Sequence, residues 1–155
     1  MHIKDEMPLD EIRARILALC EGEDDAIAIM ATVAGELYNH IDGFDWVGFY
    51  RVTAPAMLKI GPYQGGHGCL QIPFDKGVCG ASARDKKTLR VADVDAFPGH
   101  IACAASTKSE LVVPCFDAEG ALIAVLDLDS DTPAFFTEAH QDFIEDLMQE
   151  LFAKT

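Results

Sequence analysis

The middle of this chain carries a series of short strand patterns separated by turn-forming residues. Runs rich in branched and aromatic residues recur between glycines and prolines, as is typical of half-buried strands. The runs cover residues 46–52, 58–60, 70–72, 89–94, 111–116 and 121–128. Strands that follow one another through short turns pair antiparallel, and the helices of such a chain then gather on one face of the sheet. The pattern predicts an α+β fold built on an antiparallel sheet.

Helical patterns flank the strand region on both sides. Apolar residues recur at helical spacing in residues 9–19 and 26–37, and Gly22 separates the two helices. After the strands, an amphipathic pattern covers about residues 138–152, and Thr137 precedes it as a helix N-cap. We expect these N- and C-terminal helices to pack on the same face of the sheet.

A short helix is also expected inside the strand region, over residues 78–86, because small residues follow Gly77 there. The chain has 155 residues, a usual length for one domain and enough to bury a core without metals or disulfides. We therefore interpret residues 1–155 as a single domain. Its expected parts are N-terminal helices over about residues 8–39, a sheet core over about 45–130 and a C-terminal helix over about 138–152.

The charge of the chain excludes several classes of partner. The formal net charge is −14, and no cluster of lysine and arginine exceeds the one at residues 84–87, so we expect no binding to nucleic acid. An acidic surface also disfavours anionic lipid, and no apolar stretch has the length of a transmembrane helix. Residues 1–6 have no signal-peptide pattern, so we expect a cytoplasmic protein. The acidic charge of the chain is compatible with a small ligand that carries an ammonium group.

Three of the five cysteines lie beside residues that bend or end secondary structure. Cys69 directly follows Gly68, Cys79 directly precedes Gly80, and Cys103 lies in a long loop, residues 93–109, that also contains a Pro-Gly pair. A thiol at a turn can meet solvent, a second thiol or a substrate. These cysteines are candidates for redox or nucleophilic chemistry, which needs a thiolate with another thiol within reach.

Other interpretations of the cysteines remain open at this point. Cys20 lies on the apolar side of the first helix and Cys115 inside a strand, so both are interpreted as buried filler. No two cysteines have the short spacing of a zinc site, but His67 and His100 leave a scattered metal site open. Cys79 lies near a helix start, where the helix dipole favours a thiolate. The number of cysteines is odd, and a chain of this length needs no disulfide bonds to be stable, so the sequence favours a reducing compartment.

Candidate binding residues lie on the predicted strands. Asp127 and Asp129 are two residues apart at the end of the most apolar strand, so they share one face, although acids also form ordinary turns at such ends. Glu110 precedes an apolar run and is either a surface residue or a third acid of a site. Trp46 and Tyr50 share a face of the first strand, where core packing is the default, although a cation or methyl group can lie against such rings.

Taken together, these segments resemble the free methionine-(R)-sulfoxide reductases, a catalytic branch of the GAF domains. The resemblance extends from the first strand to the start of the last helix, with the cysteines in the family's order and spacing. It is carried by residues 46–50, 61–65, 69, 72–74, 77–80, 93–94, 97–103, 109–114 and 125–130. It implies a GAF-like fold that reduces free L-methionine-(R)-S-oxide to L-methionine, with thioredoxin as reductant and with no cofactor or metal.

The resemblance also assigns a role to each candidate residue. Cys103 corresponds to the nucleophile, Cys69 to the cysteine that resolves its oxidised form as a disulfide, and Cys79 to an auxiliary thiol. The residues that match the substrate site are Trp46 and Tyr50, at the methyl end, and the acids Glu110, Asp127 and Asp129. The family further implies a homodimer, to whose interface the N-terminal helices would contribute.

Two residues depart from the family's pattern. Ala104 follows Cys103 where family members usually have aspartate, and Lys108 adds a positive charge close to Glu110. Neither change removes a named catalytic group, but both bear on the pKa of the thiol and on the mobility of the loop. The alternative interpretation is a non-catalytic GAF module that binds a small ligand, which has no need of three placed thiols.

Overall fold

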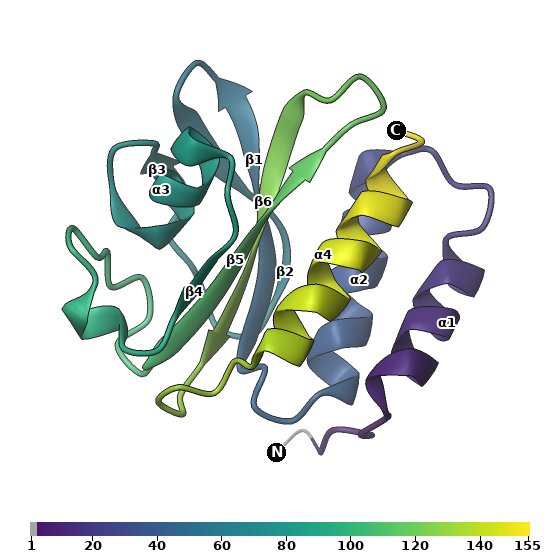
Figure 1. Ribbon diagram of the computed structural model, residues 1–155, viewed down its shortest axis with the longest axis horizontal. Coiled ribbons are helices and arrows are strands. Elements are labelled where there is room, and N and C mark those ends of the chain that lie inside the picture. Colours follow the sequence, from purple (N-terminus) through teal and green to yellow (C-terminus); the bar gives the residue numbers. More distant parts are fainter. Residues whose placement is uncertain (1–2) are drawn as a thin grey trace.

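The protein is built on one antiparallel sheet (Figure 1). The computed structural model describes residues 3–155. Residues 1–2, which belong to the N-terminal segment considered above for a signal peptide, lie outside the described part. The strands are β1 (Trp46–Ala54), β2 (Met57–Gln64), β3 (Gln71–Pro73), β4 (Leu89–Val91), β5 (Ser109–Phe116) and β6 (Leu122–Ser130). They lie in the order β3-β2-β1-β6-β5-β4, and every neighbouring pair is antiparallel.

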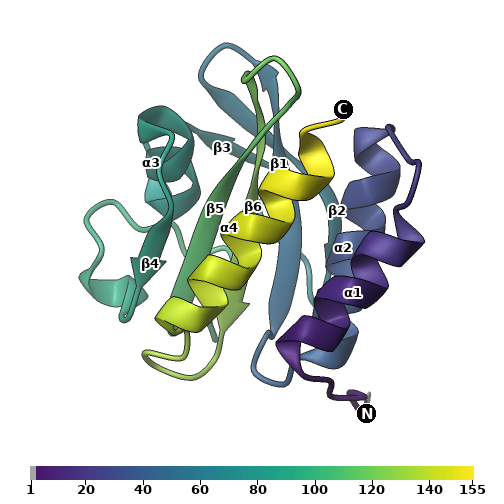
Figure 2. The same ribbon diagram turned by 45° about the vertical axis from the view of Figure 1, so that its right-hand side comes forward.

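The helices divide between the two faces of the sheet. They are α1 (Leu9–Leu19), α2 (Ala26–His40), α3 (Gly77–Asp85) and α4 (Glu138–Phe152). Figures 1 and 2 show α1, α2 and α4 on one face and α3 on the other, so the predicted fold is confirmed. The expectation that all helices gather on one face is wrong for α3, which packs against β3, β5 and β6 instead. No helix in residues 3–155 is both long and apolar enough to cross a membrane.

Side chains alternate along β1 and divide the interior into two apolar clusters. Val47 and Phe49 are fully buried against the three long helices, whereas Trp46 and Tyr50 point to the α3 face. The helix-side cluster also contains Ile12, Ile16, Leu37, Ile144 and Leu147. Burial of each such side chain stabilises the fold by about 1.5–3 kcal/mol. The helix-side cluster is the larger one, and the smaller one lies beside the polar side chains described below.

The same alternation on β6 places acids on the α3 face. Leu126 and Leu128 belong to the helix-side cluster, and Asp127 and Asp129 occupy the intervening positions. A strand has a side-chain period of two, so residues that flank buried leucines must point away from that core. The apolar pattern of β6 therefore fixes where its carboxylates point.

Two of the strand ends that differ from the sequence prediction have a clear physical cause. β2 continues through Gly61 and Pro62, where its register with β1 shifts at a bulge, so the proline does not interrupt a regular ladder. β4 ends at Val91 rather than Val94, because residues 94–96 form a 3₁₀ turn that Asp93 caps by accepting from the backbone N–H of Asp95. This turn leads the chain into the loop that carries Cys103.

Candidate active site

Three acids lie side by side on the α3 face because of the strand register. Glu110 on β5 pairs with Asp129 on β6, and Asp129 pairs in turn with Trp46 on β1. Asp127 lies two residues before Asp129 and pairs with Gly48 of β1. Gly48 has no side chain that could cover the carboxyl group of Asp127. Paired residues of an antiparallel ladder point to the same face, so the sheet presents all three carboxyl groups together.

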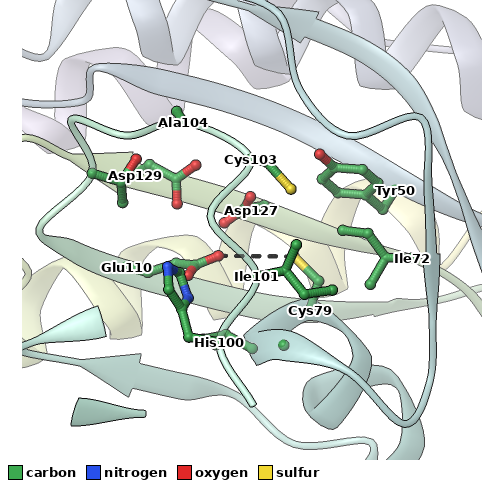
Figure 3. Close-up of a pocket in the computed structure, with 13 residues that line it drawn as sticks. Tyr50, Ile72, Cys79, His100, Ile101, Cys103, Ala104, Glu110, Asp127 and Asp129 are labelled. Carbon is green, nitrogen blue, oxygen red and sulfur yellow. Dashed lines mark hydrogen bonds between the residues drawn. The ribbon is translucent and has the colours of Figure 1, made fainter. Parts of the chain in front are cut away.

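Helix α3 and the loop of residues 97–108 close this face into a small cavity (Figure 3). The cavity is lined by Tyr50, Ile72, Gly77, Val78, Cys79, His100, Ile101, Cys103, Ala104, Thr107, Glu110, Asp127 and Asp129. Gly80 lets α3 lie close to the sheet, since a Cβ atom there would lie 2.5 Å from the carbonyl oxygen of Pro73. The cavity volume is about 30 Å³, which is room for about two water molecules.

The acids of the cavity are withdrawn from water. Glu110 and Asp127 are 6% and 5% exposed, and Asp129 is half-buried. Burial, followed by repulsion from Asp129 and Glu110, raises the pKa of Asp127 well above that of an ordinary aspartate. Burial, followed by repulsion from Glu110, raises the pKa of Asp129 in the same way. The cavity therefore favours protonated acids at a pH where free aspartates are ionised.

Cys79 projects from α3 toward the acids. Its Sγ atom lies 3.9 Å from Oε2 of Glu110, and its side chain is 4% exposed. Burial, followed by repulsion from Asp127 and Glu110, raises the pKa of this thiol well above its ordinary value. The expectation that the helix dipole favours a thiolate at Cys79 is therefore wrong, because burial and the facing carboxylates outweigh the dipole of a short helix.

The other two loop cysteines are joined to each other. Cys69 and Cys103 form a disulfide with a Cα–Cα distance of 5.2 Å, across a sequence separation of 34. Cys103 lines the cavity, and Figure 3 shows its sulfur above Asp127. Cys20 and Cys115 are free, almost fully buried and part of the helix-side core, as expected for filler.

The aromatic side chains form a continuous stack beside the cavity. Trp46 stacks on Tyr50, with 5.8 Å between ring centroids, and on Tyr63 of β2 at 5.3 Å. The indole N–H of Trp46 donates a hydrogen bond of 2.8 Å to the carbonyl oxygen of Gly66. A Cβ atom at Gly68 would lie 2.9 Å from both Trp46 and the hydroxyl of Tyr50, so this loop lies directly on the rings. Tyr63 was not predicted, because its place depends on the pairing of β2 with β1.

The scattered metal site of cysteines and histidines is not assembled. Two of its cysteines are bonded to each other, and His67 is exposed. His100 does line the cavity, and its Nδ1 atom is buried without a hydrogen-bond partner. Ala104 also lines the cavity, whereas Lys108 is exposed.

Comparison with known families and sequences gives two matches of interest. Residues 10–151 match the GAF domain family. The free methionine-R-sulfoxide reductase of Escherichia coli (strain K12) is 35% identical over 134 residues, which are 86% of this chain and 80% of that protein.

Two solved structures have the same fold over almost their whole length. One is free methionine-R-sulfoxide reductase from Neisseria meningitidis in complex with its substrate, at 36% identity and a TM-score of 0.88, covering 99% of this chain and 95% of that one. The other is fRMsr of Staphylococcus aureus in its reduced form, at 34% identity and a TM-score of 0.90, covering 99% of both chains.

Proposed function

Because this chain belongs to the GAF family and, within it, to the free methionine-R-sulfoxide reductases, we propose that it reduces free L-methionine-(R)-S-oxide to L-methionine. The observation that carries the proposal is the Cys69–Cys103 disulfide at a buried cavity lined by acids. A non-catalytic ligand-binding module has no need of a disulfide at that position.

In the proposed reaction Cys103 is the nucleophile. Its thiolate attacks the sulfur of the sulfoxide, and the oxygen leaves the substrate with Cys103 as a sulfenic acid while methionine is released. Cys69 then condenses with the sulfenic acid, which gives the disulfide and one water. An external dithiol reduces the disulfide by exchange and is itself oxidised. The sum is one sulfoxide and one dithiol converted to one sulfide, one disulfide and one water.

The acids supply the protons that this chemistry needs. The oxygen of the sulfoxide must gain protons as it departs, and we assign this role to Glu110 and Asp129. The raised pKa of Asp129 keeps a proton available near neutral pH. Asp127, whose buried Oδ1 atom has no hydrogen-bond partner, would accept from the ammonium group of the amino acid. Trp46 and Tyr50 would form the wall against the methyl group of the substrate.

The size of the cavity supports an order for the proposed steps. With the disulfide closed, about 30 Å³ is too little for a free amino acid. Substrate would therefore bind after the disulfide is reduced and the loop that carries Cys103 is released. This order prevents oxidised enzyme from holding substrate that it cannot reduce.

Three further points belong to the proposal. Thioredoxin is the proposed reductant, since a buried substrate site with an outer cysteine suits exchange with a protein dithiol. The proposed location is the cytoplasm, where the free thiols of Cys20, Cys79 and Cys115 would stay reduced. The proposed assembly is a homodimer in which α1 and α2 contribute to the interface.

A turnover assay with separate epimers tests the function. The wild-type protein, with dithiothreitol or thioredoxin as reductant, should form methionine from the R epimer of free methionine sulfoxide and not from the S epimer. Cys103→Ser should lower kcat/KM by more than about 10³-fold. Cys20→Ala, which changes a buried cysteine of the distant core, is the matched control and should keep its activity. No turnover of the R epimer by reduced wild-type protein would refute the function.

A further inference from the structure

One thiol and two carboxyl groups converge in the cavity from three different elements. They are Cys79 of α3, Glu110 of β5 and Asp127 of β6, and one ligand atom of each lies within 4.8 Å of the others. All three side chains are at least nine-tenths buried. In the described chain, no ion pair joins either carboxyl group to a lysine, arginine or histidine. The cluster thus concentrates possible ligand atoms, and no protein cation is paired with its carboxyl groups.

Asp127 gives an independent indication that the cluster receives a ligand. Its Oδ1 atom is buried and has no hydrogen-bond partner, although the residue lines the cavity. A buried polar atom without a partner costs free energy, so such atoms are rare and need an explanation. A cation in the cavity would satisfy this atom directly.

The donor set selects a class of cation. Mg²⁺ and Ca²⁺ prefer ligand shells made of oxygen alone, whereas zinc and similar ions accept thiolate sulfur together with carboxylate oxygen. Tetrahedral zinc, with bonds of about 2.3 Å to sulfur and about 2.1 Å to oxygen, separates such ligands by roughly 3.6 Å. Sγ of Cys79 is already 3.9 Å from Oε2 of Glu110, and Figure 3 marks this contact.

We propose that Cys79, Glu110 and Asp127 form a binding site for a divalent cation of the zinc class, with water in the remaining coordination position. The cavity volume of about 30 Å³ matches a cation with its water better than an organic ligand. Binding releases the thiol proton of Cys79 to solvent. The cation would occupy the carboxyl groups that the proposed substrate needs, so it would inhibit the enzyme. The binding site itself does not rest on the proposed function, whereas the inhibition does.

Cobalt(II) titration of the oxidised protein tests the binding site. With the Cys69–Cys103 disulfide intact, the free thiols are those of Cys20, Cys79 and Cys115, so a thiolate-to-cobalt charge-transfer band can be assigned by substitution. We expect one equivalent of Co²⁺ and such a band in the wild type, and competition by Zn²⁺. Cys79→Ser should lose the band, and Cys115→Ala, a matched change at a buried free cysteine, should keep it. A wild type without the band, or a band that persists in Cys79→Ser, would overturn the proposal.

A second variant guards against a folding defect in Cys79→Ser. Asp127→Asn keeps the thiol and the shape of the side chain but removes a charged ligand, so it should keep the band and bind Co²⁺ at least about tenfold more weakly. Thermal unfolding of each variant, followed by circular dichroism, checks that it is folded. Unchanged affinity in folded Asp127→Asn would overturn the assignment.

A single-turnover assay tests the inhibition separately. Protein is reduced, freed of dithiol and mixed with the R epimer with and without Zn²⁺, and methionine is measured relative to each variant's own zinc-free yield. Wild type should be inhibited at concentrations at least about tenfold lower than Cys79→Ser. Equal sensitivity would overturn the inhibition. An intact cobalt site in a wild type without any turnover would refute the proposed function and leave the metal site standing.

Discussion

Glu110 and Asp129 face each other as direct cross-strand partners on β5 and β6, inside a cavity rather than at the surface. Like charges in this arrangement are destabilising, and burial increases the cost. The fold therefore gives up stability to keep carboxyl groups together at the cavity. Burial, followed by repulsion from Glu110, raises the pKa of Asp129, so the arrangement favours a protonated Asp129, and a protonated acid is what a departing sulfoxide oxygen needs.

Asp127→Asn should stabilise the protein at neutral pH. The pKa of Asp127 is raised in the folded state, so the folded protein binds more protons than the unfolded chain above the ordinary pKa of aspartate. Stability therefore falls as the pH rises through this window, and the asparagine removes that loss. We expect a gain of about 1 kcal/mol or more at about pH 7 that vanishes at about pH 4. Urea denaturation of the oxidised protein at both pH values measures it.

Exposed Asp142 on α4 provides the matched control. Asp142→Asn should leave the free energy of unfolding unchanged within about 0.5 kcal/mol at both pH values. A loss of stability in Asp127→Asn that is equal at both pH values would contradict the pKa argument.

Gly80→Ala should displace α3 from the sheet. A Cβ atom at Gly80 would lie 2.5 Å from the carbonyl oxygen of Pro73, and backbone cannot move aside as a flexible side chain can. We expect a loss of about 1–3 kcal/mol in the free energy of unfolding and reduced turnover, because Cys79 would move with the helix. In the control Gly35→Ala, on α2, the new Cβ atom meets nothing within 4 Å, and stability should rise by about 0.5–1 kcal/mol. Urea denaturation distinguishes the two, and equal effects would be inconsistent with the close approach.

Trp46→Phe should weaken substrate binding more than the chemical step. The smaller ring keeps an aromatic side chain in the stack beside the cavity but loses the hydrogen bond to Gly66 and part of the stack on Tyr50. We expect KM for the R epimer to rise about tenfold with a much smaller change in kcat. Tyr63→Phe keeps its ring against Trp46 and removes only the hydroxyl of an exposed side chain, so its kinetics should match the wild type. Equal kinetics for Trp46→Phe would remove Trp46 from the proposed substrate site.

Strand periodicity alone was enough to place part of the site. Asp127 and Asp129 alternate with buried leucines, so their common face could be predicted from the period of two. The three long helices followed equally directly from apolar spacing, and the predicted N-cap Thr137 accepts a hydrogen bond from the backbone N–H of His140. These features are local, and local sequence determines them.

Features that depend on distant segments could not be derived from the residues in the same way. Residue patterns alone do not rank the three loop thiols, because the closing of Cys69 onto Cys103 across 34 residues is a property of the whole fold. The resemblance supplied that pairing. The expected dipole effect at Cys79 is outweighed because burial, followed by repulsion from Asp127 of β6 and Glu110 of β5, raises the pKa of its thiol. The position of Tyr63 beside Trp46 could not be predicted, because a bulge in the β1–β2 pairing sets it.

The amount of methionine formed per chain in a single turnover tests whether Cys103 is the nucleophile. The reduced proteins, freed of dithiol, are mixed with an excess of the R epimer, and the methionine formed is quantified. We expect about one methionine per chain for Cys69→Ser, with Cys103 left as a sulfenic acid, and none for Cys103→Ser. Methionine from Cys103→Ser at the yield of Cys69→Ser would contradict the assignment of Cys103 as the nucleophile.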